Sequence, residues 1–342
     1  MILTIGAGGA LCSCSQGEKK TQDTDFHYLL DEFADLKVIR FRVPGWDNLS
    51  LRQKEYAYHL SEAAKLGRDI TWDQYCKWNL PIRHVVEDIL NEYEGDRECA
   101  DFQNFTVYAK RLFFANGIHH HYSEDKFFPE CPKEYFQSLM EAVGDGEQAT
   151  ELLEVIYSPD IYPQRRSTSK TGDIVELSAV NFYDGVTREE VDKYYNSMMD
   201  PNDKTPISYG LNTKVVKEDG KVVEKPWKVG GIYGPALERI CAELEKAAAV
   251  AETDLQKEAI GKLVKYYKTG DLKTWDDFNI DWVRDTVGTI DFINGFIEDY
   301  DDPLGRKATW EGYVNMKDSA ASARTEILSA NAQWFEDNSP VD

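Results

Sequence analysis

The sequence has little positive charge and lacks long apolar runs, and both shortages exclude classes of protein. Its 342 residues include 39 basic and 61 acidic side chains, giving a formal net charge of −22. A chain this acidic repels a phosphate backbone, so we expect no nucleic-acid partner. Beyond residue 11, no apolar stretch approaches the about 20 residues that a membrane-spanning helix needs. Hydrophobic residues make up 42% of the chain, so the composition predicts a folded protein with a sizeable core.

Cysteine is scarce, and its spacing argues against cysteine-based sites. Cys76, Cys99, Cys131 and Cys241 are far apart in the sequence and form no CxxC pair. We therefore expect neither a disulfide framework nor a cysteine zinc site, and these residues fit buried apolar positions better. The sequence also has no GxSxG, phosphate-binding or GxGxxG motif, and no histidine pair at the His-x-x-x-His spacing of a helical zinc site.

The start of the sequence is typical of an exported lipoprotein. Residues 1–11 are small and apolar, and the ending Leu11-Cys12-Ser13-Cys14 resembles a bacterial lipobox with Cys14 as the lipidated residue. The polar residues 15–25 would then tether the protein to a membrane. No lysine or arginine precedes the apolar stretch, so a mis-assigned start is the alternative. We exclude residues 1–22 from the fold and expect a bacterial cell-envelope location (periplasm or outer membrane), with the cytoplasm as the alternative.

The rest of the chain alternates between helical and strand-like patterns, with helices dominant. Apolar periodicity and capping residues predict helices over residues 51–66, 82–93, 102–115, 133–143, 187–199, 234–251, 254–269 and 320–335, with two short helices starting at Thr274 and Asp281. Residues 174–183 are predicted to be β-rich, and Asp219-Gly220 predicts a hairpin between strands 211–216 and 221–225. These elements predict an α+β fold.

Half of the histidines lie together in residues 116–123. Three consecutive side chains cannot converge on one ion from a regular backbone, because neighbours in a strand point to opposite faces. The pattern therefore favours a loop after a helix cap, with histidines that hydrogen-bond locally, over a metal site. A role in lining a substrate site remains open, since functional groups concentrate on loops.

Residues 289–305 form a second segment whose side chains could take part in binding or catalysis. Apolar and polar residues alternate at its start, so Asp291 and Asn294 are not obvious core positions. A carboxylate and a carboxamide near Gly295 would suit the ammonium group of a peptide. Taken alone, the residues favour the simpler interpretation of an edge strand or loop with solvated acids.

Three segments in this order resemble the dipeptidyl peptidase III family. The segment at residues 116–129, NGIHHHYSEDKFFP, is similar to an N-terminal signature of its bacterial members. Residues 209–251 resemble the family's hairpin and following helix. The most specific segment is 291–318, DFINGFIEDYDDPLGRKATWEGYVNMKD, which resembles the stretch leading to the second lobe. The likeness spans about residues 25–342.

This resemblance implies a two-lobed zinc peptidase that removes dipeptides from the N-termini of short peptides. One lobe would hold a small β-barrel or mixed sheet with helices, and the other, mainly helical, would hold the zinc through an HExxGH helix and a later glutamate. This sequence contains no HExxGH. We therefore expect a substrate-binding lobe over residues 23–312, the start of a helical catalytic lobe over 313–342, zinc ligands in a missing C-terminal part, and no activity from this chain alone.

The resemblance also implies residues that contact the peptide. Tyr122 matches an aromatic position lining the first subsites, and Asp291 matches an acid that binds the free amine. In animal members a tyrosine lies two residues after that acid and supports the transition state. An ungapped reading places Ile293 there, between Phe292 and Asn294. Isoleucine has no hydroxyl group, so Asn294 is the substitute, and Phe292 completes the predicted substrate-binding set.

The sequence therefore supports two main hypotheses. The first is the N-terminal portion of a zinc-dependent dipeptidyl aminopeptidase, with short peptides as partners and a possible membrane tether through Cys14. The alternative is a non-catalytic peptide-binding lipoprotein derived from the same lobe. A third reading is a gene fragment that folds poorly and exposes a large apolar patch.

Overall fold

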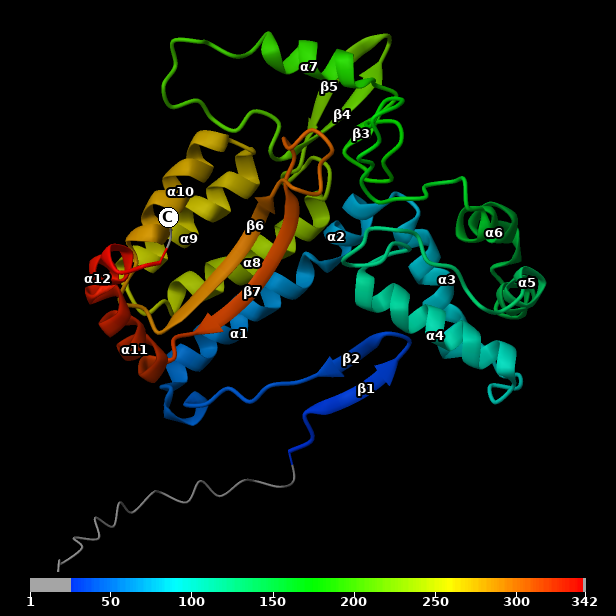
Figure 1. The fold of residues 1–342 in the computed structure, drawn as a ribbon, viewed down its shortest axis with the longest axis horizontal. Coiled ribbons are helices and arrows are strands. Elements are labelled where there is room, and N and C mark those ends of the chain that lie inside the picture. Colours follow the sequence, from blue (N-terminus) through cyan, green and yellow to red (C-terminus); the bar gives the residue numbers. More distant parts are fainter. Residues whose placement is uncertain (1–25, 341–342) are drawn as a thin grey trace, which may run out of the picture. The chain divides into compact units, whose positions relative to one another are not determined.

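A computed structural model describes residues 26–340 of the chain (Figure 1). Cys14 and the other residues of the predicted lipoprotein segment lie outside the described residues. The helices are α1 (Leu51–Leu66), α2 (Arg68–Tyr75), α3 (Asn79–Glu92), α4 (Ala100–Ala115), α5 (Lys133–Ala142), α6 (Ala149–Tyr157), α7 (Arg188–Asn196), α8 (Gly234–Ala249), α9 (Asp254–Thr269), α10 (Leu272–Arg284), α11 (Ser319–Ala330) and α12 (Ala332–Asp337). The strands are β1 (Leu29–Phe33), β2 (Leu36–Ile39), β3 (Tyr183–Asp184), β4 (Thr213–Glu218), β5 (Lys221–Pro226), β6 (Ile290–Glu298) and β7 (Thr309–Met316).

The α+β fold class predicted from the sequence is confirmed. The strands form three small sheets, β1–β2, β3–β4–β5 and β6–β7. Of the two forms left open for the β part, the described residues contain small sheets and no closed barrel. Among these residues, no helix is both long and apolar enough to cross a membrane.

The chain divides into two units, residues 1–42 and 43–342. The described part of the first unit is the antiparallel hairpin β1–β2, which carries an irregularity between Leu29 and Asp31. Within it, the guanidinium groups of Arg40 and Arg42 lie 4.4 and 4.5 Å from the ring centroid of Phe26. The sequence did not predict this hairpin. All elements described below belong to the second unit.

Local capping signals fixed several helix ends as predicted. Ser50 accepts a hydrogen bond from the backbone of Gln53 and completes a capping box at the start of α1, and Thr187 does the same at α7. Helix α4 ends at Asn116 and α9 at Gly270, both in the left-handed conformation that closes a helix. The Asp219-Gly220 turn joins β4 to β5 in the predicted hairpin.

Two predictions of local structure were wrong. Residues 174–182 form turns instead of a strand, because Asp173 accepts the backbone N–H of Val175 at 2.9 Å and Ser178 donates to the carbonyl of Ile174 at 2.6 Å. The two short helices expected from Thr274 and Asp281 are one helix, α10. The strand β7 was also missed.

The helix α10 is continuous because the acidic side chains of Asp271 and Asp281 have partners that are compatible with a helix. Asp271 caps its first turn by accepting from the backbone of Thr274. The buried carboxylate of Asp281 pairs with Lys262 of α9, so it does not end the helix. At the other end of the chain, the helix predicted over residues 320–335 is divided at Asn331 into α11 and α12.

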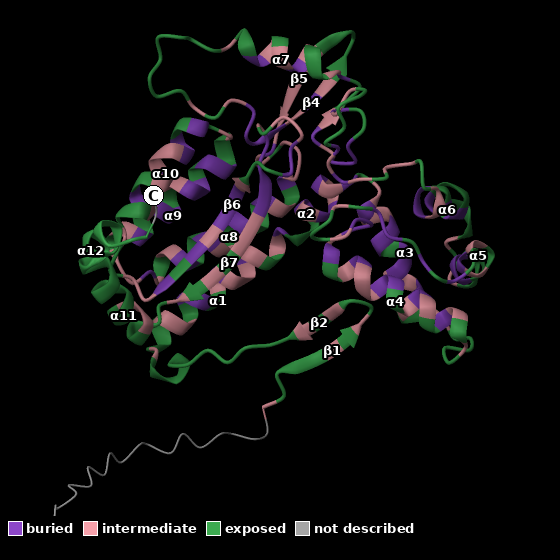
Figure 2. Ribbon diagram, viewed as in Figure 1, coloured by how far each residue is buried: buried purple, intermediate pink, exposed green. Residues whose placement is uncertain are grey.

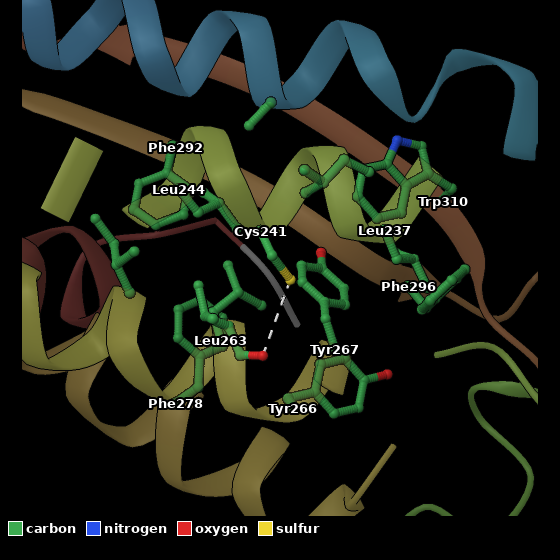
Figure 3. Close-up of a cluster of buried hydrophobic side chains, with 14 of the residues drawn as sticks. Leu237, Cys241, Leu244, Leu263, Tyr266, Tyr267, Phe278, Phe292, Phe296 and Trp310 are labelled. Carbon is green, nitrogen blue, oxygen red and sulfur yellow. Dashed lines mark hydrogen bonds between the residues drawn. The ribbon is translucent and has the colours of Figure 1, made fainter. Parts of the chain in front are cut away.

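The β6–β7 hairpin lies along α1, and together with α8, α9 and α10 these elements enclose the larger hydrophobic core (Figure 1). Figure 3 shows Phe292 and Phe296 of β6 beside Leu237 and Leu244 of α8. A second core lies among α2 to α6. The larger core therefore holds one face of β6 in place.

Burial is uneven along the chain. Figure 2 shows exposed residues throughout α11 and α12, and no residue of either helix is buried. Of the four cysteines within residues 26–340, Cys76, Cys131 and Cys241 are buried, as the sequence predicted, whereas Cys99 is partly exposed. The predicted lobe boundary at 312/313 falls inside β7, and the lobe assignment itself stays a prediction.

Candidate functional site

The strand β6 turns its predicted site residues to two different faces. Phe292 and Asn294 are 4% and 2% exposed and point into the core with Phe296. Asp291 and Ile293 alternate with them and lie on the opposite face, where Asp291 is exposed. The structure therefore does not bring the three predicted site residues of β6, Asp291, Phe292 and Asn294, together on one surface.

Asp291 already has a donor within the protein. The indole N–H of Trp282 in α10 donates to Asp291 Oδ1 at 3.0 Å and to the carbonyl of Phe292 at 3.1 Å. The backbone N–H of Phe292 donates to the same carboxylate oxygen at 2.7 Å. One oxygen of the predicted amine-binding acid is thus held by its own strand and by α10.

The start of β6 is fixed by a second carboxylate. Glu252 Oε2 accepts the backbone N–H groups of Thr289 and Ile290 at 2.9 and 2.8 Å, and its other oxygen accepts from Gln53 at 2.7 Å. Burial acts to raise the pKa of Glu252, but these hydrogen bonds outweigh it and hold the pKa below its usual value. Internal hydrogen bonds therefore hold this end of β6 in place.

Asn294 and Phe292 occupy packing positions. Asn294 Oδ1 accepts from the hydroxyl of Tyr267 in α9 at 2.8 Å, and its Nδ2 has no hydrogen-bond partner among the described residues. Phe292 lies 6.4 Å from Phe278 of α10, measured between ring centroids. Their role in substrate binding stays a prediction, and both side chains now have a structural role in the core as well.

Tyr122 lies on the loop that follows α4 and is 87% exposed. His120 makes local hydrogen bonds within this loop, as the sequence predicted, whereas the partner of His119 lies 43 residues further along the chain. His120 Nδ1 accepts the backbone N–H groups of Tyr122 and Ser123, and His119 Nε2 lies 2.9 Å from the carbonyl of Tyr162. Burial lowers the pKa of His119 to about 4. Among the described residues there is no group of three or more histidine, cysteine or acidic side chains that could hold a metal ion.

A buried arginine joins this loop to the turn after β6. Arg165 Nη2 lies 3.3 Å from Glu124 Oε1 and 3.0 Å from Asp301 Oδ1. The backbone N–H of Arg165 also donates to the carbonyl of Glu124 at 2.9 Å. Asp301 follows Tyr300 directly, so the loop of Tyr122 is connected to the far end of β6. With a rise of about 3.3 Å per residue, that end lies about 23 Å along the strand from Asp291.

At this far end an irregularity in the sheet changes which face a side chain occupies. Phe296 pairs with Trp310 but Glu298 pairs with Thr309, so β6 has one extra residue against β7. Such a bulge reverses the alternation. Glu298 is consequently exposed and does not continue the core-facing series of Phe292, Asn294 and Phe296. The bulge moves this carboxylate to the face of β7 that carries Glu311.

Glu298 and Glu311 form an acidic surface without internal donors. Burial raises the pKa of Glu311, and the negative charges of Glu298 and Asp301 raise it further. Among the described residues, no hydrogen-bond donor reaches the side chain of Glu298 or Glu311. Tyr300, two residues after Glu298, is 57% exposed beside them. This surface combines unsatisfied negative charge with an exposed phenol, which is the chemistry that binds an ammonium group.

The sequence contained a signal for this surface. The family resemblance implies an acid followed two residues later by tyrosine, and Glu298 and Tyr300 have that spacing, whereas Asp291 is followed by Ile293. The alignment without gaps that selected Asp291 left out the second position with this acid-x-tyrosine spacing, at Glu298 and Tyr300. The role of Asp291 stays a prediction, and Glu298 is a second candidate for it.

The structure also has a cavity away from these positions. It measures about 260 Å³ and is lined by Lys77, Tyr162, Asn181, Tyr183 and Asp184, among others. None of the predicted site residues lines it.

Comparison with known proteins points to one family. Residues 185–341 match the sequence model of peptidase family M49. The chain is 25% identical to dipeptidyl peptidase 3 of Homo sapiens over 327 residues, covering 83% of this chain and 44% of that protein. It is 24% identical to dipeptidyl peptidase 3 of Dictyostelium discoideum over 323 residues, covering 86% and 45%. The chain therefore spans less than half the length of the curated relatives it matches.

Solved structures show the same fold. A dipeptidyl peptidase III from Caldithrix abyssi superimposes with a TM-score of 0.59 at 20% identity, covering 86% of this chain and 45% of that one. A dipeptidyl-peptidase III from Corallococcus sp. strain EGB gives a TM-score of 0.57 at 18% identity, covering 88% and 45%. The fold of the described residues is thus shared with part of these structures.

Proposed function

We propose a function from the premise that the chain belongs to the dipeptidyl peptidase III family: it forms the peptide-binding portion of a zinc-dependent dipeptidyl peptidase. Its relatives are peptidases and extend over more than twice the length that this chain covers. The proposed enzyme removes dipeptides from the N-termini of short peptides. The described residues contribute recognition of the peptide N-terminus.

The observation that carries the proposal is the acidic surface of Glu298 and Glu311 beside Tyr300. Two neighbouring carboxylates without internal donors repel each other, and a bound ammonium group relieves that repulsion. A site that favours a free amine fixes the distance from the peptide's N-terminus to the bond that is cut. Such a site accounts for the release of dipeptides in preference to internal cleavage.

The zinc ion of this family does not fit the described residues, which offer no suitable group of ligands. Its ligands belong, in this proposal, to a part of the protein beyond the present sequence. When bound there, zinc would lower the pKa of a water molecule and polarise the peptide carbonyl. The described residues would orient the substrate, and we assign no catalytic step to them.

The binding proposal is tested by calorimetry on this chain with a tetrapeptide and with its N-acetylated form. We expect the free amine to bind more tightly. Glu298→Gln should weaken binding of the free peptide by about 1.5–3 kcal/mol, the range of a hydrogen bond to a charged group, and should remove the preference over the acetylated peptide. Glu326→Gln, on the exposed helix α11, is the matched control. Equal binding of both peptides to the unmodified chain would rule out amine recognition.

The enzymatic proposal is tested on the gene with its downstream sequence. The encoded protein should contain HExxGH and release dipeptides from an arginyl-arginyl reporter, and a chelator should stop the release. Chelator-insensitive turnover, or no HExxGH in the continuing frame, would contradict it. Peptide binding without turnover would favour the alternative, a non-catalytic peptide-binding protein.

The cell-envelope location remains a separate proposal that rests on Cys14. Metabolic labelling with a fatty acid should modify the natural protein in its own host. The label should disappear in Cys14→Ser. Labelling that persists in this variant would argue against the lipobox.

A further inference from the structure

Arg165 is a buried charge held between two acids that are far apart in the sequence. It is 4% exposed, and Asp301 is 1% exposed. Its guanidinium group contacts Glu124 in the loop after α4 and Asp301 in the turn after β6. The contact to Glu124 has the alignment of a hydrogen bond, whereas the contact to Asp301 at 3.0 Å is an ion pair without it.

The surroundings of Arg165 hold it in one orientation. Its guanidinium carbon lies 4.2 Å from the ring centroid of Tyr75, the last residue of α2. Its carbonyl accepts the backbone N–H of Ala179 at 2.9 Å. The neighbouring Arg166 gives Glu124 a second cationic partner at 3.3 Å. A planar guanidinium with several fixed donors suits this bridging position better than a lysine would.

Each acid on the bridge lies beside an exposed aromatic residue. Glu124 is two residues after Tyr122, and Asp301 directly follows Tyr300. Both tyrosines are largely exposed, so neither is held in place by its own burial. Arg165 therefore links the loop of Tyr122 to the turn of Tyr300 through its ion pairs with Glu124 and Asp301.

We propose that Arg165 is a positioning residue that fixes Tyr122 and Tyr300 relative to each other, so that a peptide meets both at once. This inference rests on the proposed peptide-binding function and adds to it. The arginine touches no substrate itself. It acts through Glu124 and Asp301, and loss of the contact to Asp301 lets the two segments move independently.

The test uses Asp301→Asn, which keeps the shape of the side chain and removes its charge. Hydrogen exchange followed by mass spectrometry should show faster exchange in residues 118–126, although the change lies far away in the sequence. Binding of the free tetrapeptide should weaken by about fivefold or more, within the usual range of coupling between contacting groups. Asp299→Asn, an exposed acid two residues away, is the matched control and should leave both quantities unchanged.

Hydrogen exchange in the core distinguishes a positioning role of Arg165 from a general loss of stability. Exchange in α9, around Leu263 and Tyr267, should be the same in Asp301→Asn and in the unmodified chain. Arg165→Lys, which keeps the charge but loses the planar fork, should show a smaller effect of the same kind. Unchanged exchange in residues 118–126, or an equal rise in α9, would overturn the proposal.

The outcome also distinguishes this inference from the proposed function. If the unmodified chain binds no tetrapeptide, the proposed function fails, and hydrogen exchange still decides whether Arg165 links the two segments. If the peptide binds with the same affinity to Asp301→Asn, the linkage has no part in recognition and the inference fails alone.

Discussion

The two ends of β6 have the same kind of charge and use it differently. At the start of the strand, Glu252 and Asp291 accept hydrogen bonds from the backbone, from Gln53 and from Trp282. At the far end, Glu298 and Glu311 face each other without such donors among the described residues. Carboxylates that the protein satisfies itself stabilise the fold, whereas carboxylates left unsatisfied on a surface are available to a ligand.

The largest expected effect tests whether Phe292 belongs to the core or to the site. Phe292→Ala removes a buried ring beside Phe278 and should lower the free energy of unfolding by about 3–5 kcal/mol. Urea denaturation followed by circular dichroism measures it. Phe292→Leu, which keeps most of the volume, should lose less and bind the tetrapeptide normally. A stable Phe292→Leu protein with much weaker peptide binding would instead place this residue in the site.

A smaller effect is expected at Glu252. Glu252→Gln removes the charge that accepts the N–H groups of Thr289 and Ile290, and should lower the free energy of unfolding by about 1 kcal/mol after solvent screening. The folded-state pKa of Glu252 is below its unfolded value, so this stabilisation is present above the unfolded pKa and is lost as pH falls through the folded pKa.

Denaturation measured at several pH values checks the Glu252 prediction. The difference between Glu252→Gln and the unmodified chain should be largest near neutral pH and should shrink in acid. Peptide binding at neutral pH should be unaffected. A difference that stays constant into strong acid would mean that the carboxylate charge has no part in holding the start of β6.

The smallest effect is expected for Asp291→Asn. This variant decides which end of β6 binds the amine of the peptide. If Glu298 binds the amine, Asp291→Asn should change the dissociation constant of the free tetrapeptide by less than about twofold. The same calorimetry as for Glu298→Gln measures it. A large loss in Asp291→Asn together with no loss in Glu298→Gln would restore the assignment based on the sequence.

Much of the helical framework could be predicted because its signals are local. The ranges of α1 and α9 follow from apolar periodicity and from caps such as Ser50 and Gly270. The continuous helix α10 could not be predicted, because the partner of Asp281 is Lys262 on another helix. The turns after residue 173 were missed because their short polar side chains compete with strand formation through local hydrogen bonds.

The site was harder to predict than the fold. Period-two alternation assigns the faces of β6 correctly up to Phe296, and the bulge then reverses the assignment at Glu298. No pattern in the sequence marks that extra residue. The bridge through Arg165 was also invisible, because its two acids come from segments that meet only in the folded chain.

The buried cysteines offer a practical route to measuring distances across the site. Burial raises the pKa of Cys76 to about 12 and that of Cys241 to about 11, and also raises that of Cys131, so these thiols stay protonated and shielded at neutral pH. Only Cys99 and the two cysteines outside the described residues would need replacement. Spin labels at Ser123→Cys and Asp299→Cys would then report directly on the separation of the two segments in solution.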